Sequence, residues 1–274
     1  MKLLQLTDIH LTTPGQTIAG RDPNANFEKA LTHALTHHPD AEALFITGDL
    51  SDWGDEDDYL RLRTRLQSVA MPVHLCIGNH DDRPKMLTSF PDLADEDGHV
   101  QRVVPLSRGQ AIIVDTWAEG THAGHFCEIR AAWLSAALAA APGPVWLFMH
   151  HNPAPLGIAP MDLIMQRDAA RLAETLRPHR AKIAHIFHGH CHLPLSGTFH
   201  GIPFSAPRGT NHAGWPDFSA TRLLAGADLA EAYAVILVRD DSTMVHMVEY
   251  GYAGEVRSEG SPDQAQWDRL TMIR

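Results

Sequence analysis

The sequence predicts an α/β fold around a largely parallel β-sheet, and two observations support this fold class. Short apolar runs, each typical of a strand buried on both faces, recur through the first two thirds of the chain. Segments with the apolar spacing of helices lie between most of these runs, and such alternation is typical of parallel sheets. The apolar runs are residues 2–7, 43–47, 72–77, 144–149 and 184–187.

The helices are predicted from apolar residues that recur three or four positions apart. In residues 24–37 this stripe includes Phe27 and Leu31, and Asp22 followed by Pro23 suits the cap and first position of a helix. The remaining helices are predicted over residues 56–69, 130–140 and 162–177, the last on a weaker stripe.

The pattern changes after residue 195, where two β-hairpins are predicted. Residues 195–206 would turn at His200-Gly201, and residues 234–250 would turn at Asp240-Asp241. Between them, residues 206–233 are rich in Gly, Pro and Ala without a clear period, and we expect a cap or oligomerisation loop there. We therefore divide the chain into a core of residues 1–205 and a C-terminal part, residues 206–274, which completes a second sheet.

Composition and charge narrow the class of protein. The 274 residues are 20% charged and 44% hydrophobic, as in ordinary soluble domains, and the net charge of −11 argues against a nucleic acid polymer as partner. Three cysteines are too few for a disulfide framework. The first residues lack the apolar region of a signal peptide, and no run approaches the roughly 20 apolar residues of a membrane span. We therefore expect a cytoplasmic protein that does not bind membranes.

Polar side chains of metal-binding type follow each of the five apolar runs. Ligands of α/β folds gather outside the carboxyl ends of the strands, so we expect these side chains to meet at one edge. Carboxylate, amide and imidazole groups suit first-row metals, and two such ions can clamp a phosphoryl group. The motifs are Asp8-x-His10, Gly48-Asp49, Gly78-Asn79-His80-Asp81, His150-His151 and Gly189-His190-Cys191-His192.

Each motif has a structural alternative when it is considered alone. Asp49 after a glycine could form an ordinary turn, and the side chain of Asn79 could bond to loop backbone. Five such turns in one chain favour a shared site instead. The acidic run of residues 52–58 is interpreted as the solvated start of a helix, where carboxylates complement the helix dipole. His185 and His188 precede the last glycine and are interpreted as strand or supporting residues.

The order of these motifs, DxH, GD, GNHD, H and GHxH, resembles that of the calcineurin-like metallophosphoesterase family. Within that family, the length and flanking residues are most similar to those of bacterial glycerophosphodiesterases and class III cyclic-nucleotide phosphodiesterases. The resemblance spans residues 8–192 and extends more weakly to residue 212. It implies a four-layer αββα sandwich of two mixed sheets flanked by helices, with residues 1–205 as the catalytic core.

The resemblance also implies two divalent or mixed-valent metal ions per chain, drawn from iron, manganese, zinc and cobalt. The first ion would be bound by Asp8, His10, Asp49 and His192. The second ion would be bound by Asp49, Asn79, His150 and His190, so that Asp49 bridges the pair.

For catalysis, the resemblance implies a metal-activated hydroxide that attacks phosphorus in line with the leaving ester oxygen. Asp49 would act as the bridging ligand, and His80 would stabilise the phosphoryl group or protonate the leaving alkoxide. Asp81 is expected to orient His80 or a loop amide. The residues expected to contact substrate are His80, Arg21, His151 and His212.

The fold does not fix the substrate. We favour a small phosphodiester, either a glycerophosphodiester or a cyclic nucleotide, because a diester carries one negative charge and needs less cationic clamping than a monoester dianion. A phosphomonoesterase or protein phosphatase of the same fold is an alternative. A non-catalytic metal-binding scaffold is another alternative. It is disfavoured because no ligand position departs from the family pattern. The loop of residues 206–233 favours a homo-oligomer, a dimer or higher.

Overall fold

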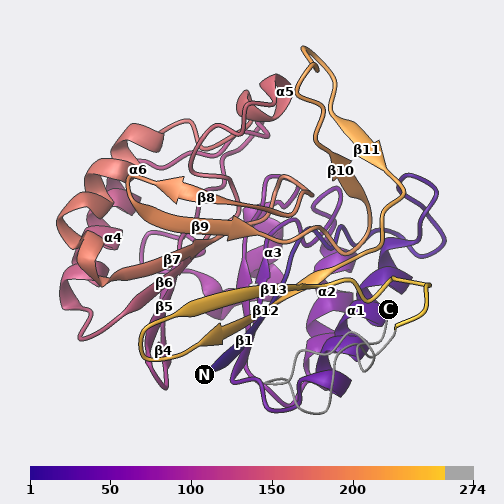
Figure 1. Cartoon of the computed structure of the whole chain (residues 1–274), viewed down its shortest axis with the longest axis horizontal. Coiled ribbons are helices and arrows are strands. Elements are labelled where there is room, and N and C mark those ends of the chain that lie inside the picture. The colour runs from indigo at the N-terminus through magenta and orange to yellow at the C-terminus, as the bar shows by residue number, and fades with distance from the viewer. Residues whose placement is uncertain (257–274) are drawn as a thin grey trace, which may run out of the picture.

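Two mixed β-sheets pack face to face, and helices cover their outer faces, so the molecule has four layers (Figure 1). The structure is a computed structural model, which describes residues 1–256. The first sheet has the strand order β13-β12-β1-β2-β3, in which β1, β2 and β3 are parallel and β12 and β13 are antiparallel to their neighbours. Its strands are β1 (Lys2–Leu6), β2 (Ala43–Thr47), β3 (Val73–Cys76), β12 (Tyr233–Val238) and β13 (Thr243–Val248).

The second sheet has the order β4-β5-β6-β7-β9-β8. Its four central strands run parallel, and the two edge strands are antiparallel to their neighbours. The α/β class is thus confirmed, and so is the four-layer arrangement of two mixed sheets that the family resemblance implied. The strands are β4 (Arg102–Leu106), β5 (Gly109–Ile113), β6 (Val145–Phe148), β7 (Ile183–Phe187), β8 (Leu195–Phe199) and β9 (Ile202–Ala206).

The core between the two sheets explains why the predicted strands are apolar on both faces. Phe45 of β2 stacks on Phe148 of β6 with ring centroids 3.8 Å apart, and Leu3 of β1 packs in the same cluster. The next residue of β1, Leu4, points to the opposite face and packs with the helices. Strand β1 therefore contributes to two hydrophobic cores.

Helices from two parts of the chain cover the outer faces. The first sheet is covered by α1 (Pro23–His37), α2 (Glu56–Leu66) and α3 (Arg83–Ser89), through buried residues such as Phe27, Tyr59 and Met86. The second sheet is covered by α4 (Glu128–Ala140) and α6 (Ala169–Leu176), through Leu134 and Leu172 among others. Two 3₁₀ turns, η1 (Pro91–Leu93) and η2 (Arg177–Lys182), follow α3 and α6.

Most predicted elements are present with shifted ends, and one predicted helix is wrong. Asp22 caps α1, because its side chain accepts a hydrogen bond from Ala25 N at 3.1 Å. The helix predicted over residues 162–177 is divided into α5 (Ala159–Asp162) and α6. Between them the chain turns away to the loop after β6, where Gln166 N donates to Asn152 O at 3.2 Å.

Both predicted hairpins are confirmed. Strands β8 and β9 turn at His200 and Gly201, which both have positive φ, and β12 pairs with β13 across Asp240-Asp241. The segment of residues 206–233, predicted as a cap or oligomerisation loop, contains a third hairpin made by β10 (Ala213–Trp215) and β11 (Ala225–Ala227). This hairpin projects from the body of the molecule (Figure 1).

The C-terminal part of the chain contributes to the sheet that contains β1, through β12 and β13. Residues 257–274 of this part lie outside the described residues. Among the helices of residues 1–256, none has the length and apolar character needed to cross a membrane.

Candidate metal centre

The ligand-type side chains predicted from the motifs lie together at the carboxyl ends of the parallel strands. The loops that carry them are joined by backbone hydrogen bonds. Asp8 N donates to Gly48 O at 3.1 Å, and His10 N donates to Asp49 O at 2.9 Å. The second sheet reaches the same place, because His190 N donates to the Asp8 carboxylate at 3.0 Å. The two sheets therefore deliver their strand ends to one site.

Backbone strain is concentrated in this site. Seven non-glycine residues have positive φ in the described part of the chain, and five of them belong to the predicted ligand set. Such conformations cost roughly 1–3 kcal/mol each and persist where the surrounding structure holds them. The strain indicates that these loops are held in place to aim side chains. The five residues are Asp8, His10, Asp49, His190 and His192.

We use the name first metal position for Asp8, His10, Asp49 and His192, whose ligand atoms all lie within 4.8 Å of one another. His10 Nε2 faces His192 Nε2 at 3.2 Å, an arrangement that two imidazole nitrogens adopt around a shared cation. The carboxylates are close, since His10 Nε2 is 3.6 Å from Asp49 Oδ2 and His192 Nε2 is 3.5 Å from Asp8 Oδ1. This donor set of two imidazoles and two carboxylates suits a first-row divalent metal.

We use the name second metal position for the predicted set of Asp49, Asn79, His150 and His190. His150 Nε2 lies 3.3 Å from Asp49 Oδ1 and 3.0 Å from Asn79 Oδ1. His190 is buried, and its Nε2 has no hydrogen-bond partner, which is unusual for a buried polar atom and fits a metal ligand. The Asp49 carboxylate faces both positions, with Oδ2 toward His10 and Oδ1 toward His150.

The outer nitrogen of three candidate ligand histidines is hydrogen-bonded to an oxygen. His10 Nδ1 lies 3.0 Å from Asp52 Oδ1, His150 Nδ1 lies 2.7 Å from Thr47 O, and His192 Nδ1 lies 3.0 Å from the backbone oxygen of His212. An Nδ1–H that donates to an oxygen leaves the Nε2 lone pair directed at the centre, as is typical of metal-binding histidines. The predicted ligands are thus supported in the tautomer that metal binding needs.

The electrostatics of the site favour a cation. Burial alone would lower the pKa of His150, but attraction by the Asp49 carboxylate raises it to about 9. Burial also opposes ionisation of Asp49, yet the charge of His150 holds the pKa of Asp49 well below its ordinary value. Burial lowers the pKa of His190 well below its ordinary value, so its imidazole is neutral and has a free lone pair. The attraction that holds a proton on His150 would equally favour a metal ion, whose binding would release that proton.

Asp81 fastens the two loops of the first sheet to each other. Its carboxylate accepts hydrogen bonds from Leu50 N at 3.0 Å, Ser51 N at 3.1 Å and Gly78 N at 2.8 Å. The hydroxyl of Tyr59 donates to the same group at 3.1 Å. The prediction that Asp81 orients loop amides is therefore confirmed.

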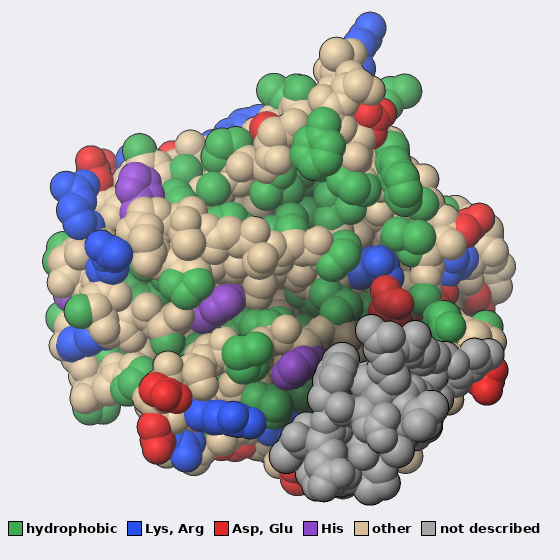
Figure 2. All heavy atoms as spheres, in the orientation of Figure 1, with side chains coloured by type: hydrophobic (Ala, Val, Ile, Leu, Met, Phe, Trp, Pro, Cys, Tyr) green, Lys and Arg blue, Asp and Glu red, His purple; other side chains and the backbone are tan. Residues whose placement is uncertain are grey.

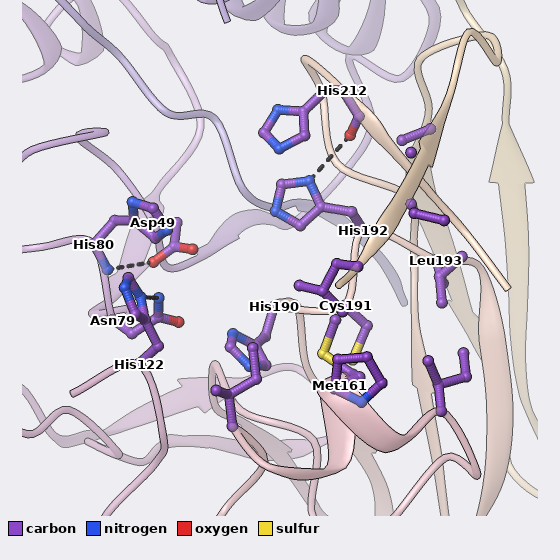
Figure 3. Close-up of a pocket in the computed structure, with 18 of the residues that line it drawn as sticks. Asp49, Asn79, His80, His122, Met161, His190, Cys191, His192, Leu193 and His212 are labelled. Atoms are coloured by element: carbon purple, nitrogen blue, oxygen red, sulfur yellow. Dashed lines mark hydrogen bonds between the residues drawn. The ribbon is translucent and has the colours of Figure 1, made fainter. Parts of the chain in front are cut away.

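The four residues predicted to contact substrate have different surroundings. His80 and His212 line a cavity that opens at the centre (Figure 3). His151 is buried beneath it, with Nδ1 2.8 Å from Thr116 Oγ1 and Nε2 3.2 Å from His122 O. Arg21 does not line the cavity.

The guanidinium of Arg21 is directed elsewhere. It forms an ion pair with Glu231 and donates to the backbone oxygen of Leu229 at 3.3 Å. These contacts fasten the early loop to the segment that follows β11.

Sequence reasoning missed two residues of the site. Asp52 belongs to the acidic run that was interpreted as solvated, yet its side chain is only 15% exposed because it bonds to His10. Its position three residues after Asp49 was the available signal. His122 comes from a loop without any motif, and its Nδ1 lies 2.9 Å from Asn79 Nδ2 (Figure 3).

The remaining residues of the HIFHGHCH segment do not belong to the ligand set. His185 Nε2 lies 2.8 Å from Ser205 Oγ, and His188 Nδ1 lies 2.9 Å from Gly189 O. Burial raises the pKa of Cys191 well above its ordinary value, which favours the thiol form of this side chain.

Comparison with known proteins agrees with this geometry. A probable cyclic nucleotide phosphodiesterase of Rhodopseudomonas palustris is 35% identical over 263 residues, which are 94% of this chain and 96% of the relative. A probable glycerophosphodiester phosphodiesterase GpdQ of Arcobacter nitrofigilis is 28% identical over 200 residues, which are 70% of this chain and 72% of the relative.

The fold is also found among solved structures. A dimetal phosphatase from Danio rerio has a TM-score of 0.70 at 15% identity, and the match covers 91% of this chain and 96% of that protein. The model of the calcineurin-like phosphoesterase family matches residues 1–194, the part of the chain that carries all five motifs. From this match, and from a full-length relative above 30% identity, the chain belongs to the calcineurin-like phosphoesterase family.

Proposed function

We propose that this protein is a binuclear-metal-dependent phosphodiesterase that hydrolyses small phosphodiesters, with glycerophosphodiesters and cyclic nucleotides as the two substrate classes that its relatives' names suggest. One observation carries the proposal: the two oxygens of the buried Asp49 carboxylate face two separate groups of ligand atoms. A carboxylate in that position can join two cations.

The residues fit a pair of ions from the group of iron, manganese, zinc and cobalt. Mixed nitrogen and oxygen donors suit these metals, and the unpartnered Nε2 of buried His190 accounts for one ligand of the second position. When bound, such a pair lowers the pKa of a coordinated water toward neutrality and neutralises charge on phosphoryl oxygens.

The protein's own contribution to catalysis would come mainly from His80. His80 is oriented by the backbone, because its Nδ1 lies 2.9 Å from Asp52 O. Its Nε2 then remains available to a substrate in the cavity, either to stabilise the phosphoryl group or to protonate the leaving oxygen. The backbone amide of His80 also donates to the Asp49 carboxylate at 2.9 Å. This bond fixes the position of His80, the proposed proton donor, relative to the proposed bridging ligand.

The charge of the cavity favours a diester over the alternatives. Among the described residues that line it, Arg222 is the one lysine or arginine. A monoester dianion or a phosphoprotein would need more positive charge than this to offset the carboxylates of the centre. The intact ligand set argues against a non-catalytic scaffold.

A cytoplasmic location and a homo-oligomer built through residues 206–233 are further proposals. Cell fractionation tests the location, and analytical sedimentation tests the oligomeric state.

The experiment compares two substrates that release the same chromophore. Protein reconstituted with Mn²⁺ should hydrolyse bis(p-nitrophenyl) phosphate with a higher kcat/KM than p-nitrophenyl phosphate. A preference for the monoester would overturn the proposal of a diesterase. Failure with both substrates at two metals per chain would overturn the proposal of an enzyme.

Substitution of ligands tests the metal assignment in the same assay. Asn79→Ala should lower the metal content toward one ion per chain and reduce diester hydrolysis. His246→Ala is a matched control, since that histidine is exposed on β13 and distant from the centre. Unchanged metal content and activity in Asn79→Ala would show that this ligand is assigned wrongly.

A further inference from the structure

The cavity beside the metal centre has two chemically different ends. Its volume is about 770 Å³, which is in the range of pockets that enclose a small organic molecule. One end is formed by the polar residues of the centre, including Asp49, His80 and His190. The other end is formed by apolar side chains from three parts of the chain outside the ligand set.

We call these side chains the apolar wall. In the close-up, Met161 and Leu193 lie on the side of His190 and His192 that is remote from His80 (Figure 3). Apolar atoms also gather at the base of the projecting hairpin on the molecular surface (Figure 2). The wall comes from the α5 region, the residue after His192 and the β10–β11 hairpin, and it consists of Ile158, Met161, Leu163, Leu193, Trp215 and Leu224.

Several residues of the wall are unusually exposed for their size. Leu163 is 71% exposed, and Trp215 and Leu224 are each 52% exposed. Burial of large apolar side chains away from water is favourable. Here these side chains surround an open cavity and not a packed core, so a ligand could bury them. The wall therefore favours an apolar occupant.

The wall also lacks the groups that recognise a polar ligand. Outside the metal centre, the described residues that line the cavity include no Ser, Thr, Asn, Gln, Asp or Glu side chain, and Arg222 is the one that carries a charge. A sugar or glycerol hydroxyl placed there would leave water without gaining a side-chain hydrogen bond, which is unfavourable. An alkyl or aryl group would meet no such cost.

We propose that the apolar wall binds one ester group of the substrate, and that this group is an alkyl or aryl group. The inference rests on the proposed function and narrows its substrate class to acyclic phosphodiesters with one apolar arm. The wall and the centre are continuous, because Leu193 directly follows His192 and both line the same cavity. A phosphate held at the centre thus places its ester arm beside the wall.

The test uses alkyl p-nitrophenyl phosphates, in which the chromogenic leaving group is constant and the alkyl group grows from methyl to butyl to hexyl. A fully buried methylene increases kcat/KM about fourfold and a half-buried one about twofold. Against a wall that is half exposed, the hexyl ester should exceed the methyl ester by about 30-fold in the wild-type protein.

Substitutions in the wall should weaken the dependence of kcat/KM on the length of the alkyl group. In Leu163→Ser combined with Leu224→Ser, the hexyl-to-methyl ratio should fall at least about threefold. The matched control is Phe218→Ser, which alters a residue that is 72% exposed between β10 and β11 and does not line this cavity. The control should retain the wild-type ratio.

The outcomes separate the inference from the proposed function. Hydrolysis of all three esters with equal kcat/KM in the wild-type protein would overturn the inference and leave the diesterase proposal intact. Absence of hydrolysis of every diester at full metal occupancy would overturn both. Because the wild-type series needs no substitution, a variant that fails to fold cannot conceal the answer.

Discussion

Replacement of Asp52 by leucine is expected to weaken the first metal position selectively. Asp52 Oδ1 lies 3.0 Å from His10 Nδ1, and the pKa of Asp52 is lowered by this bond although burial opposes its ionisation. An ionised carboxylate on Nδ1 fixes the ring and raises the basicity of Nε2, which is the nitrogen that faces His192. Without it, His10 loses both its orientation and part of its affinity for a cation.

The magnitude follows from what such outer partners contribute. Their loss typically lowers metal affinity 10- to 100-fold, which corresponds to about 1.4–2.7 kcal/mol. Asp52→Asn keeps an acceptor oxygen and loses the charge, so it should fall near the lower end of this range. The backbone oxygen of Asp52, which bonds to His80, is retained in both variants. The second position should be affected little, because the outer nitrogen of His150 bonds to Thr47 O.

Calorimetric titration of the metal-free protein with Mn²⁺ resolves the two positions. The matched control is Asp55→Leu, since Asp55 caps α2 without a side-chain hydrogen bond. Equal weakening of both positions, or wild-type affinity at both in Asp52→Leu, would refute the reasoning. The melting temperature of the metal-free variant shows whether the loop itself has been disturbed.

Three further predictions concern the loops and the stability of the fold. A Cβ at Gly78 would overlap the Asp49 carboxylate, so Gly78→Ala should reduce kcat/KM about 100-fold, whereas Gly143→Ala, which meets nothing within 4 Å, should retain activity. Asp81→Ala should lower the free energy of unfolding by about 3–5 kcal/mol in urea denaturation, because three buried amides and a tyrosine hydroxyl lose their acceptor; a loss below 1 kcal/mol would contradict this. Burial lowers the pKa of His185 to about 4, so the folded state binds fewer protons than the unfolded state, and stability should fall as the pH drops from about 6.5 to about 4. In chelator, His185→Asn should reduce that loss by about 1–3 kcal/mol, and an unchanged pH dependence would count against the assignment.

The fold class could be predicted because the strands are buried on both faces. Residues such as Leu3 and Leu4 fill two cores at once, which produces the continuous apolar runs of the sequence. Of the two edge strands of the second sheet, β8 was predicted within its hairpin but β4 was not, since edge strands are half exposed. In β4, Val103 is 41% exposed and Pro105 interrupts the pattern, so β4 and its partner β5 were not predicted.

The candidate ligands could be predicted because each follows directly on a strand. Contacts between distant segments could not be predicted in this way. Nothing local indicates that Arg21 pairs with Glu231, which is 210 positions away, and this contact removes its guanidinium from the cavity. Asp52 was assigned to solvent because a run of carboxylates usually is solvated, and only the three-dimensional position of His10 shows otherwise.

Anomalous diffraction from crystals grown with Mn²⁺ tests the central claim most directly, because it locates the ions without reference to activity. We expect two peaks per chain, one among Asp8, His10 and His192 and the other among Asn79, His150 and His190. Asp49 should lie within about 2.2 Å of both ions through its two oxygens. A single peak, or two peaks of which only one is in contact with Asp49, would contradict a metal pair joined by this carboxylate.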